Sequence, residues 1–145
     1  MIIILGTAIL LSLVVFSIYY NNELNKKTQA SLNNKAEEFV TKWGNYTDSS
    51  SEAYLYSLSP YLSGEEYQAF EDEAKTLREY ISSGYESNTA KTTIKYCRTD
   101  KRGNEYQSVC EAVVEIIDYS KKDSILHISW EKTDKEYLIS NWYTE

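Results

Sequence analysis

The chain opens with an apolar run that carries no charge. Residues 2–20 are nineteen uncharged residues, interrupted by four small or polar ones. A helix of this length rises about 30 Å, which matches the hydrocarbon core of a bilayer. Aromatic residues close the run, where they are common at a membrane interface. The pattern predicts a membrane anchor over residues 1–20, represented by Ile2, Leu10, Leu13, Phe16, Tyr19 and Tyr20.

A cleaved signal peptide and a buried helix are the alternatives for this run. A signal peptide has a basic region before its apolar stretch and a small-x-small cleavage site after it, and neither pattern is present. No cysteine lies near the run for attachment of a lipid. We therefore expect an uncleaved, single-pass anchor in the cell membrane, with the lipid bilayer as its partner.

A polar segment and then an amphipathic helix follow the apolar run. Residues 21–34 are rich in Asn, Lys, Gln and Ser, and we expect them to extend the helix outward as a stalk. Apolar side chains with helical spacing then predict a core-facing helix over residues 35–43, which Gly44 and Asn45 end. Its apolar face consists of Ala36, Phe39, Val40 and Trp43.

Two shorter helices are expected before residue 88. Polar residues 48–51 offer N-caps for the first, and Pro60 interrupts it. Ser63 and Glu66 have the spacing of a capping box at the start of the second, which Gly84 ends. The expected inner faces are Tyr54, Leu55 and Leu58 in one helix and Tyr67, Phe70, Ala74, Leu77 and Ile81 in the other.

From about residue 88 the apolar period changes to two, which predicts strands. Four strands are expected, at residues 90–99, 105–119, 124–130 and 136–143, with short turns at 103–104, 120–123 and 133–135. Such short links join antiparallel neighbours, so the strands form a meander. Helices followed by strands indicate an α+β domain over residues 35–145, with helices packed on a curved four-stranded antiparallel sheet.

The two cysteines are predicted to form a disulfide across the first hairpin. If residues 103–104 are a two-residue turn, Arg102 faces Glu105 and the numbers of opposed residues add up to 207. Cys97 and Cys110 then face each other at a non-hydrogen-bonded pair, where side chains come closest. Two reduced core cysteines are the alternative, whereas the spacing matches no common metal or redox motif.

Two features predict opposite orientations in the membrane. Lys26 and Lys27 follow the apolar run, which favours a cytoplasmic body by the positive-inside rule. A stable disulfide needs an oxidising compartment and favours the other side. We give the disulfide more weight and expect an extracytoplasmic body.

Composition excludes several classes of function. The chain has 42% hydrophobic and 26% charged residues, as in ordinary globular domains, and a net charge of −7. That charge argues against nucleic acid as a partner, because such binding depends on neutralising phosphates. One histidine and two cysteines cannot form an ordinary zinc site by themselves. We assign no metal ligand, no cofactor and no catalytic residue.

The residues that were weighed for chemistry have simpler structural explanations. His127 shares a strand face with Ile125 and Ser129, and the strand carboxylates Glu111, Glu115 and Asp118 are candidate general bases that are more often solvated. The acidic residues 71–73 are interpreted as a solvated helix face, and residues 45–47 match a glycosylation sequon that is common by chance. Tyrosine is enriched in interfaces, so a possible interface is assigned to Tyr54, Tyr61 and Tyr67.

The order of these features resembles a known superfamily. The helix Ala36-Glu37-Glu38-Phe39-Val40-x-x-Trp43, the segment Leu58-Ser59-Pro60-Tyr61-Leu62-Ser63 and the meander look like the nuclear-transport-factor-2-like (cystatin-like) fold. With its anchor, the chain is similar to membrane-anchored assembly subunits of type IV secretion and conjugation machines. That resemblance implies an extracytoplasmic scaffold, often oligomeric. Ketosteroid isomerase-like enzymes of this fold use an Asp or Asp/His pair in the sheet cone, and no such pair maps onto this chain.

We therefore expect a non-enzymatic membrane protein whose body docks other subunits of an envelope-spanning complex and can form a homo-oligomer. A small-ligand-binding or enzymatic cone tethered to the membrane is the alternative. A membrane-anchored inhibitor or immunity-type protein is a third possibility.

Overall fold

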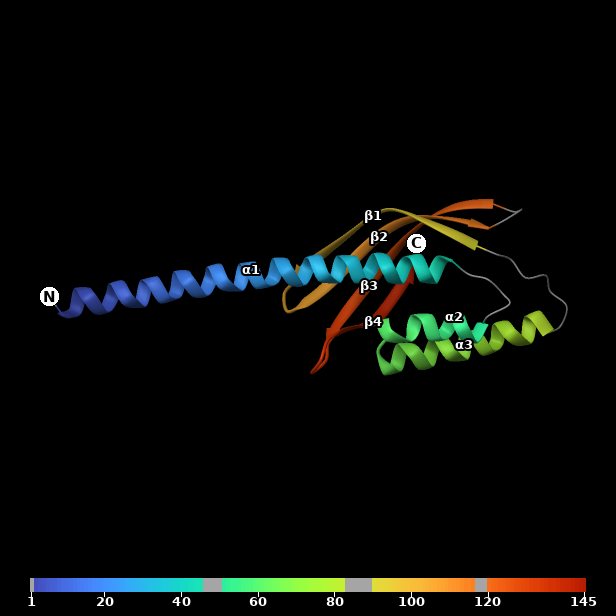
Figure 1. Ribbon diagram of the computed structural model, residues 1–145, viewed down its shortest axis with the longest axis horizontal. Helices are drawn as coiled ribbons and strands as arrows, with labels where there is room; N and C mark the ends of the chain where they lie inside the picture. Colours follow the sequence, from blue (N-terminus) through green and yellow to red (C-terminus); the bar gives the residue numbers. More distant parts are fainter. Residues whose placement is uncertain (1, 46–50, 83–89, 117–119) are drawn as a thin grey trace.

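The described part of the protein combines three α-helices and a short 3-10 helix with one sheet, as a computed structural model shows (Figure 1). The structure describes residues 2–45, 51–82, 90–116 and 120–145, except for the side chains of residues 2–11, 51–53, 73–74, 76–82, 116 and 120. The helices are α1 (Ile2–Gly44), α2 (Ser51–Leu58), the short 3-10 helix η2 (Ser59–Tyr61) and α3 (Gly64–Ser82). The strands are β1 (Ala90–Arg102), β2 (Glu105–Ile116), β3 (Ser120–Lys132) and β4 (Tyr137–Thr144).

The sheet confirms the predicted α+β class and the predicted meander. Its four strands are antiparallel and lie in the order β1-β2-β3-β4. Arg102 pairs with Glu105 next to the turn, and Cys97 pairs with Cys110. The register then shifts by one residue at a bulge between Ile94 and Tyr96. The two-residue turn sets the pairing of the first hairpin as far as this bulge.

Helix α1 lies between the sheet and the two shorter helices. In Figure 1 the sheet passes along one side of α1, and α2 and α3 lie together on the other side. The predicted inner face of α1 is confirmed, since Ala36, Phe39 and Val40 are fully buried. The core around them is completed by Leu58, Tyr61, Leu62, Tyr106, Cys110, Ala112, Leu126, Ile128, Trp130 and Ile139.

Helix α1 is continuous, so the predicted stalk and the predicted domain helix form one element. The only glycine before its last residue is Gly6, and it contains no proline, so nothing stops the helix between the apolar run and the core. Contact with the sheet begins before residue 35: Leu32 is only 3% exposed, and Asn25 accepts hydrogen bonds from Lys101 and Tyr106. The contacts of residues 21–34 with the domain therefore begin at Asn25.

The start of α3 is tied to the edge of the sheet. The Glu66 amide donates to Ser63 Oγ at 3.4 Å, as the predicted N-cap requires. The Ser63 amide donates to the Ile139 carbonyl at 2.8 Å, so β4 takes the place of a Glu66 side-chain acceptor. Pro60 lies in η2, where its missing amide costs no hydrogen bond. Gly84, the caps at residues 48–50 and the side chains of Ala74, Leu77 and Ile81 lie outside the described residues.

The turn predicted at residues 120–123 is wrong, because these residues begin β3. Strand β2 is described as far as Ile116, and residues 117–119 of the predicted strand lie outside the described residues. Strands β1 and β3 extend to Arg102 and Lys132. Cross-strand charge pairs explain why such polar residues remain in the sheet. Lys121 Nζ lies 3.3 Å from a Glu115 carboxylate oxygen, and opposite charges on paired strands stabilise a sheet.

Candidate functional site

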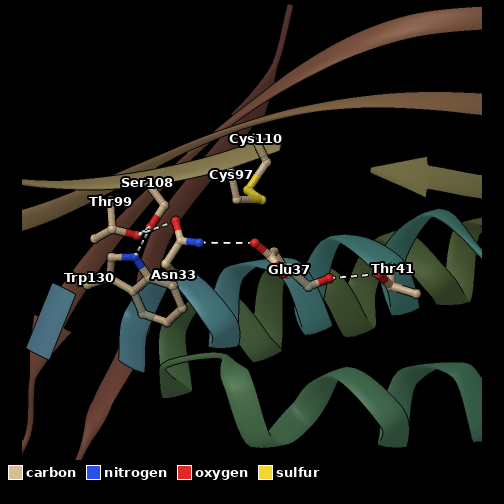
Figure 2. The surroundings of a disulfide bond; sticks show 8 residues. All are labelled: Asn33, Glu37, Thr41, Cys97, Thr99, Ser108, Cys110 and Trp130. Atoms are coloured by element: carbon tan, nitrogen blue, oxygen red, sulfur yellow. Dashed lines mark hydrogen bonds between the residues drawn. A yellow bond between two sulfur atoms is a disulfide. The ribbon is translucent and has the colours of Figure 1, made fainter. Parts of the chain in front are cut away.

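The predicted disulfide between Cys97 and Cys110 is confirmed. The two sulfur atoms are bonded at 2.00 Å, and the described part of the chain holds no free cysteine. Figure 2 shows the bond on the inner face of the sheet, pointing toward α1. Cys110 is fully buried, whereas Cys97 is partly exposed at the edge of the core. The disulfide thus joins the edge strand β1 to β2 on the face of the sheet that α1 covers.

A buried polar network lies beside the disulfide and was missed from the sequence. Ser108 is fully buried, and its hydroxyl lies 2.6 Å from Thr99 Oγ1 and accepts a 2.8 Å hydrogen bond from Trp130 Nε1. The Thr99 hydroxyl in turn donates to Asn33 Oδ1 on α1 at 3.5 Å (Figure 2). The numbers 99 and 108 add up to 207, so the register rule applied to the cysteines places this pair on the same face.

The hydrogen bonds of this network all run in one direction, from Trp130 on the sheet to Glu37 on α1. Trp130 donates to Ser108, and because Thr99 gives its proton to Asn33, the Ser108 hydroxyl donates to Thr99. The Asn33 amide nitrogen then donates to Glu37 Oε1 at 3.0 Å. A one-way chain that ends on a carboxylate is cooperative, because each bond polarises the next. The network therefore fixes the helix on the sheet.

The three candidate interface tyrosines are not exposed. Tyr61 is 6% exposed and belongs to the core, and its hydroxyl donates to Glu38 Oε2 at 3.0 Å. Tyr54 and Tyr67 are half-buried and pack against the core, and the Tyr54 hydroxyl donates to the Trp43 carbonyl. Tyr61 is therefore a core residue, and an interface role for the half-buried Tyr54 and Tyr67 stays a prediction. Among the tyrosines of the body whose side chains the structure describes, Tyr56, Tyr96 and Tyr143 are exposed.

His127 lies on the face of the sheet that points away from α1. Its ring stacks on Tyr143, with 4.6 Å between centroids and 7° between planes. Its Nε2 lies 3.5 Å from Glu145 Oε1 and makes no hydrogen bond to a described residue. The described contacts of His127 are thus an aromatic stack and a distant carboxylate, which supports the packing interpretation.

The carboxylates weighed as general bases occupy solvated or ion-paired positions. Glu111 and Asp123 both accept hydrogen bonds from Lys95, at 2.7 and 2.9 Å. These bonds raise the pKa of Lys95 above its usual range. Glu115 pairs with Lys121, and Asp118 lies outside the described residues. Glu71 and Asp72 are exposed on α3, as expected for a solvated helix face.

A shallow groove of about 480 Å³ runs between α1 and the entry to β4. Lys35 Nζ crosses it and donates to Glu136 Oε2 and to the Tyr137 carbonyl, both at 2.7 Å. The hydrogen bond from Lys35, and then its charge, hold the pKa of Glu136 below its ordinary value of 4.5. The charged groups of the groove, Lys35, Glu38 and Glu136, are thus already partnered within the protein, which leaves little charge to orient a ligand.

The sequon asparagine takes part in the fold. Asn45 Oδ1 accepts a 2.8 Å hydrogen bond from the Thr92 amide at the edge of β1. Residues 46–47 of the sequon lie outside the described residues. This hydrogen bond therefore attaches the end of α1 to the edge strand β1.

The described part of the apolar run, residues 12–20, is a fully exposed helix that extends beyond the body (Figure 1). Within the described residues, no helix combines the length and apolar character that a membrane crossing requires. Leu13, Phe16, Tyr19 and Tyr20 of the predicted anchor are described and exposed. The side chains of Ile2 and Leu10 lie outside the described part.

The chain lacks recognisable relatives in three comparisons. No protein-family model, no curated protein and no solved structure matches it. Among the described residues, no three His, Cys, Asp or Glu side chains are grouped so that they could hold a metal ion.

Proposed function

We propose that this chain is a single-pass membrane protein whose extracytoplasmic body serves as a non-enzymatic assembly subunit of an envelope-spanning secretion or conjugation complex. The observation that carries the proposal is the continuity of α1. One helix contains both the uncharged run of residues 2–20 and the centre of the core at Phe39 and Val40. The body is thereby joined to the apolar segment without a hinge.

The exposure of the run supports lipid as its surroundings. Leu13, Val14, Val15, Phe16 and Ile18 are each between 54% and 66% exposed. Successive helical residues lie 100° apart, so these side chains surround the helix and do not form one stripe. A helix that is apolar on all sides suits a lipid environment, whereas a coiled-coil partner needs a single apolar seam.

The disulfide supports an extracytoplasmic body. Structural disulfides persist in oxidising compartments, and the bond between Cys97 and Cys110 lies in the core of the fold. Two lysines after the run, Lys26 and Lys27, favour the opposite orientation, but Lys26 is paired with Glu23 at 3.1 Å. The disulfide is the stronger argument.

A scaffold fits the described surface better than an enzyme does. The core is filled by side chains, the groove beside α1 is shallow, and its lysine is already bonded. The outer face of the sheet carries Tyr96 and Tyr143, both about half exposed, and no helix covers it in Figure 1. Tyrosine-bearing surfaces of this kind suit other subunits or a second copy of the chain. The likeness to the nuclear-transport-factor-2-like fold is part of the same proposal.

Affinity purification from native membranes tests this function. The tagged full chain is cross-linked mildly in cells and recovered with its neighbours, which are identified by mass spectrometry. The proposal predicts co-recovery of an ATPase and channel subunits, reduced in a Tyr96→Ser/Tyr143→Ser variant but not in a Tyr56→Ser control on α2. Recovery of the chain alone, or only with itself, would contradict the assembly role and would favour a search for a small ligand.

A further inference from the structure

The first hairpin returns to α1 close to the end of the apolar run. Lys101 Nζ donates to Asn25 Oδ1 at 3.0 Å, and the Tyr106 hydroxyl donates to the same atom at 3.0 Å. Asn25 lies five residues beyond Tyr20, which is about 7.5 Å along a helix axis. The headgroup layer on each side of a bilayer is about 5–8 Å thick. If residues 2–20 fill the hydrocarbon core, Lys101 is therefore held at the level of the lipid headgroups.

The same end of the body carries most of the unneutralised positive charge. Both the β1–β2 turn and the β3–β4 turn lie at the end of the body from which the N-terminal arm of α1 extends (Figure 1). Residues 23–35, 100–106 and 131–137 together hold seven basic and six acidic side chains, a net charge of +1. The rest of the chain holds eight basic and sixteen acidic ones, a net charge of −8. This end therefore has a slightly positive balance of charge, whereas the rest of the chain is acidic on balance.

Ion pairs neutralise part of the acidic charge at this end. Glu23 is paired with Lys26, and Glu136 with Lys35. Asp100 is paired with Arg98 at 2.9 Å. In the three segments at this end, the described cations without an ion-pair partner are Lys27, Lys101, Arg102, Lys132 and Lys135. Elsewhere in the described chain, Lys42, Lys75, Lys91 and Lys122 also have none. Lys101 and Arg102 lie at the tip of the hairpin that touches α1, and both are exposed.

We propose that the tip of the β1–β2 hairpin is a lipid-contact element, in which Lys101 and Arg102 bind the phosphates of anionic headgroups. This inference rests on the proposed membrane anchor. The hydrogen bonds to Asn25 hold the tip in place before lipid binds, so contact requires no rearrangement of the backbone. The contact fixes the tilt of the body on the membrane in addition to the single crossing of α1.

Acetylation of lysines in the full chain tests the contact residue by residue. The protein is reconstituted in phosphatidylcholine vesicles with and without phosphatidylglycerol, and the rate at each lysine is followed by mass spectrometry. An attraction of about 1 kcal/mol per basic residue at an anionic surface corresponds to about fivefold slower modification of Lys101. High salt is expected to abolish this difference. Lys121 and Lys122, near the opposite end of the sheet, are the internal controls and keep their rates.

Hydrogen exchange in two matched variants tests the same contact without acetylating lysines. Lys101→Gln/Arg102→Gln and Lys121→Gln/Lys122→Gln remove the same charge from opposite ends of the body. The first is expected to abolish the anionic-lipid protection of the amides at residues 103–105 in hydrogen exchange, and the second to retain it. Loss of that protection in both variants would overturn the inference.

The outcomes separate this inference from the anchor. Equal Lys101 rates in both vesicles, with the protein floating with the lipid, would overturn the headgroup contact and leave the anchor intact. Slower modification of Lys121 and Lys122 to the same extent would indicate non-specific adsorption and would also overturn it. Failure of the protein to float with either vesicle would overturn the anchor and, with it, the headgroup contact.

Discussion

Gly44, the last residue of α1, lies directly against Thr92 on the edge strand. A β-carbon on Gly44 would come within 1.7 Å of Thr92 Oγ1 and 2.7 Å of Thr92 Cβ. Rotation of the threonine side chain moves Oγ1 but leaves Cβ in place. The contact therefore requires glycine at position 44. With glycine there, the end of α1 packs directly against β1, and Asn45 Oδ1 accepts a hydrogen bond from the Thr92 amide.

Gly44→Ala is expected to destabilise the fold by about 1–3 kcal/mol, because overpacking forces the helix end away from β1. Gly64→Ala is the matched control, since nothing lies within 4 Å of a β-carbon at that helical position. The control is expected to be neutral or slightly stabilising, because alanine favours helix. Urea unfolding of both variants checks this, and equal midpoints would contradict the close contact.

The disulfide is expected to stabilise the domain. Closing a fourteen-residue loop between Cys97 and Cys110 restricts the unfolded chain and contributes about 3 kcal/mol in the chain-entropy model. Unfolding with and without reductant measures the difference, and a Cys97→Ala/Cys110→Ala variant shows whether the reductant acts elsewhere. Alkylation of unreduced protein should add no label, whereas labelling of both cysteines would contradict the bond.

Ser108→Ala removes the centre of the buried network. Trp130 Nε1 then loses its acceptor at a site with no access to water, which costs about 1–3 kcal/mol. Ser140→Ala is the control, because its half-buried hydroxyl makes a 3.4 Å bond to the Ser129 carbonyl on the outer part of the sheet. Thermal unfolding and the indole proton shift of Trp130 should both respond to the first variant alone. A similar stability loss in both variants would indicate that the network contributes little.

The pair formed by Lys35 and Glu136 predicts a pH-dependent contribution to stability. Lys35 lowers the folded-state pKa of Glu136 below its ordinary value of 4.5. A lowered carboxyl pKa stabilises the fold above the unfolded-state value, and this contribution is lost as the pH falls through the folded-state pKa. Glu136→Gln should therefore be less stable than the native chain at pH 7, and the two should converge below pH 4.5.

Glu131→Gln serves as the control for this pH dependence. Glu131 is an exposed neighbour with no ion-pair partner among the described residues. Its replacement should leave the pH dependence of the unfolding free energy unchanged. A difference between native chain and Glu136→Gln that persists unchanged at pH 3 would contradict a role for the Glu136 charge.

The sheet order and the disulfide followed from the sequence because each depends on local information. Short turns limit consecutive strands to antiparallel neighbours, and the two-residue turn after Arg102 fixes the register as far as the cysteines. The turn at residues 120–123 was predicted wrongly because Ser, Lys and Asp are typical of turns. The pairing of Lys121 and Asp123 with residues on other strands decides their conformation, and that pairing is tertiary.

The candidate site was less predictable because its residues come together only in the fold. Tyrosine occurs both in cores and in interfaces, so the pattern around Tyr61 could not distinguish them; the contact with Phe39 and Glu38 places it in the core. The pair Thr99 and Ser108 was missed, although the hairpin register that paired the cysteines also places these two residues opposite each other. Their third partner, Asn33, lies 66 residues from Thr99, and no local pattern connects them.

Membrane integration of the full chain is the most direct test of the account. Leu13→Lys/Phe16→Lys places two charges in the apolar run, each costing about 2.5–3.5 kcal/mol at the centre of a membrane helix. Asn21→Lys/Asn22→Lys adds two charges just outside the run as a control. Native chain and control are expected to resist alkaline carbonate extraction and to float with membranes, while the first variant is extracted. Extraction of the native chain to the same extent as Leu13→Lys/Phe16→Lys would contradict the membrane-anchored role.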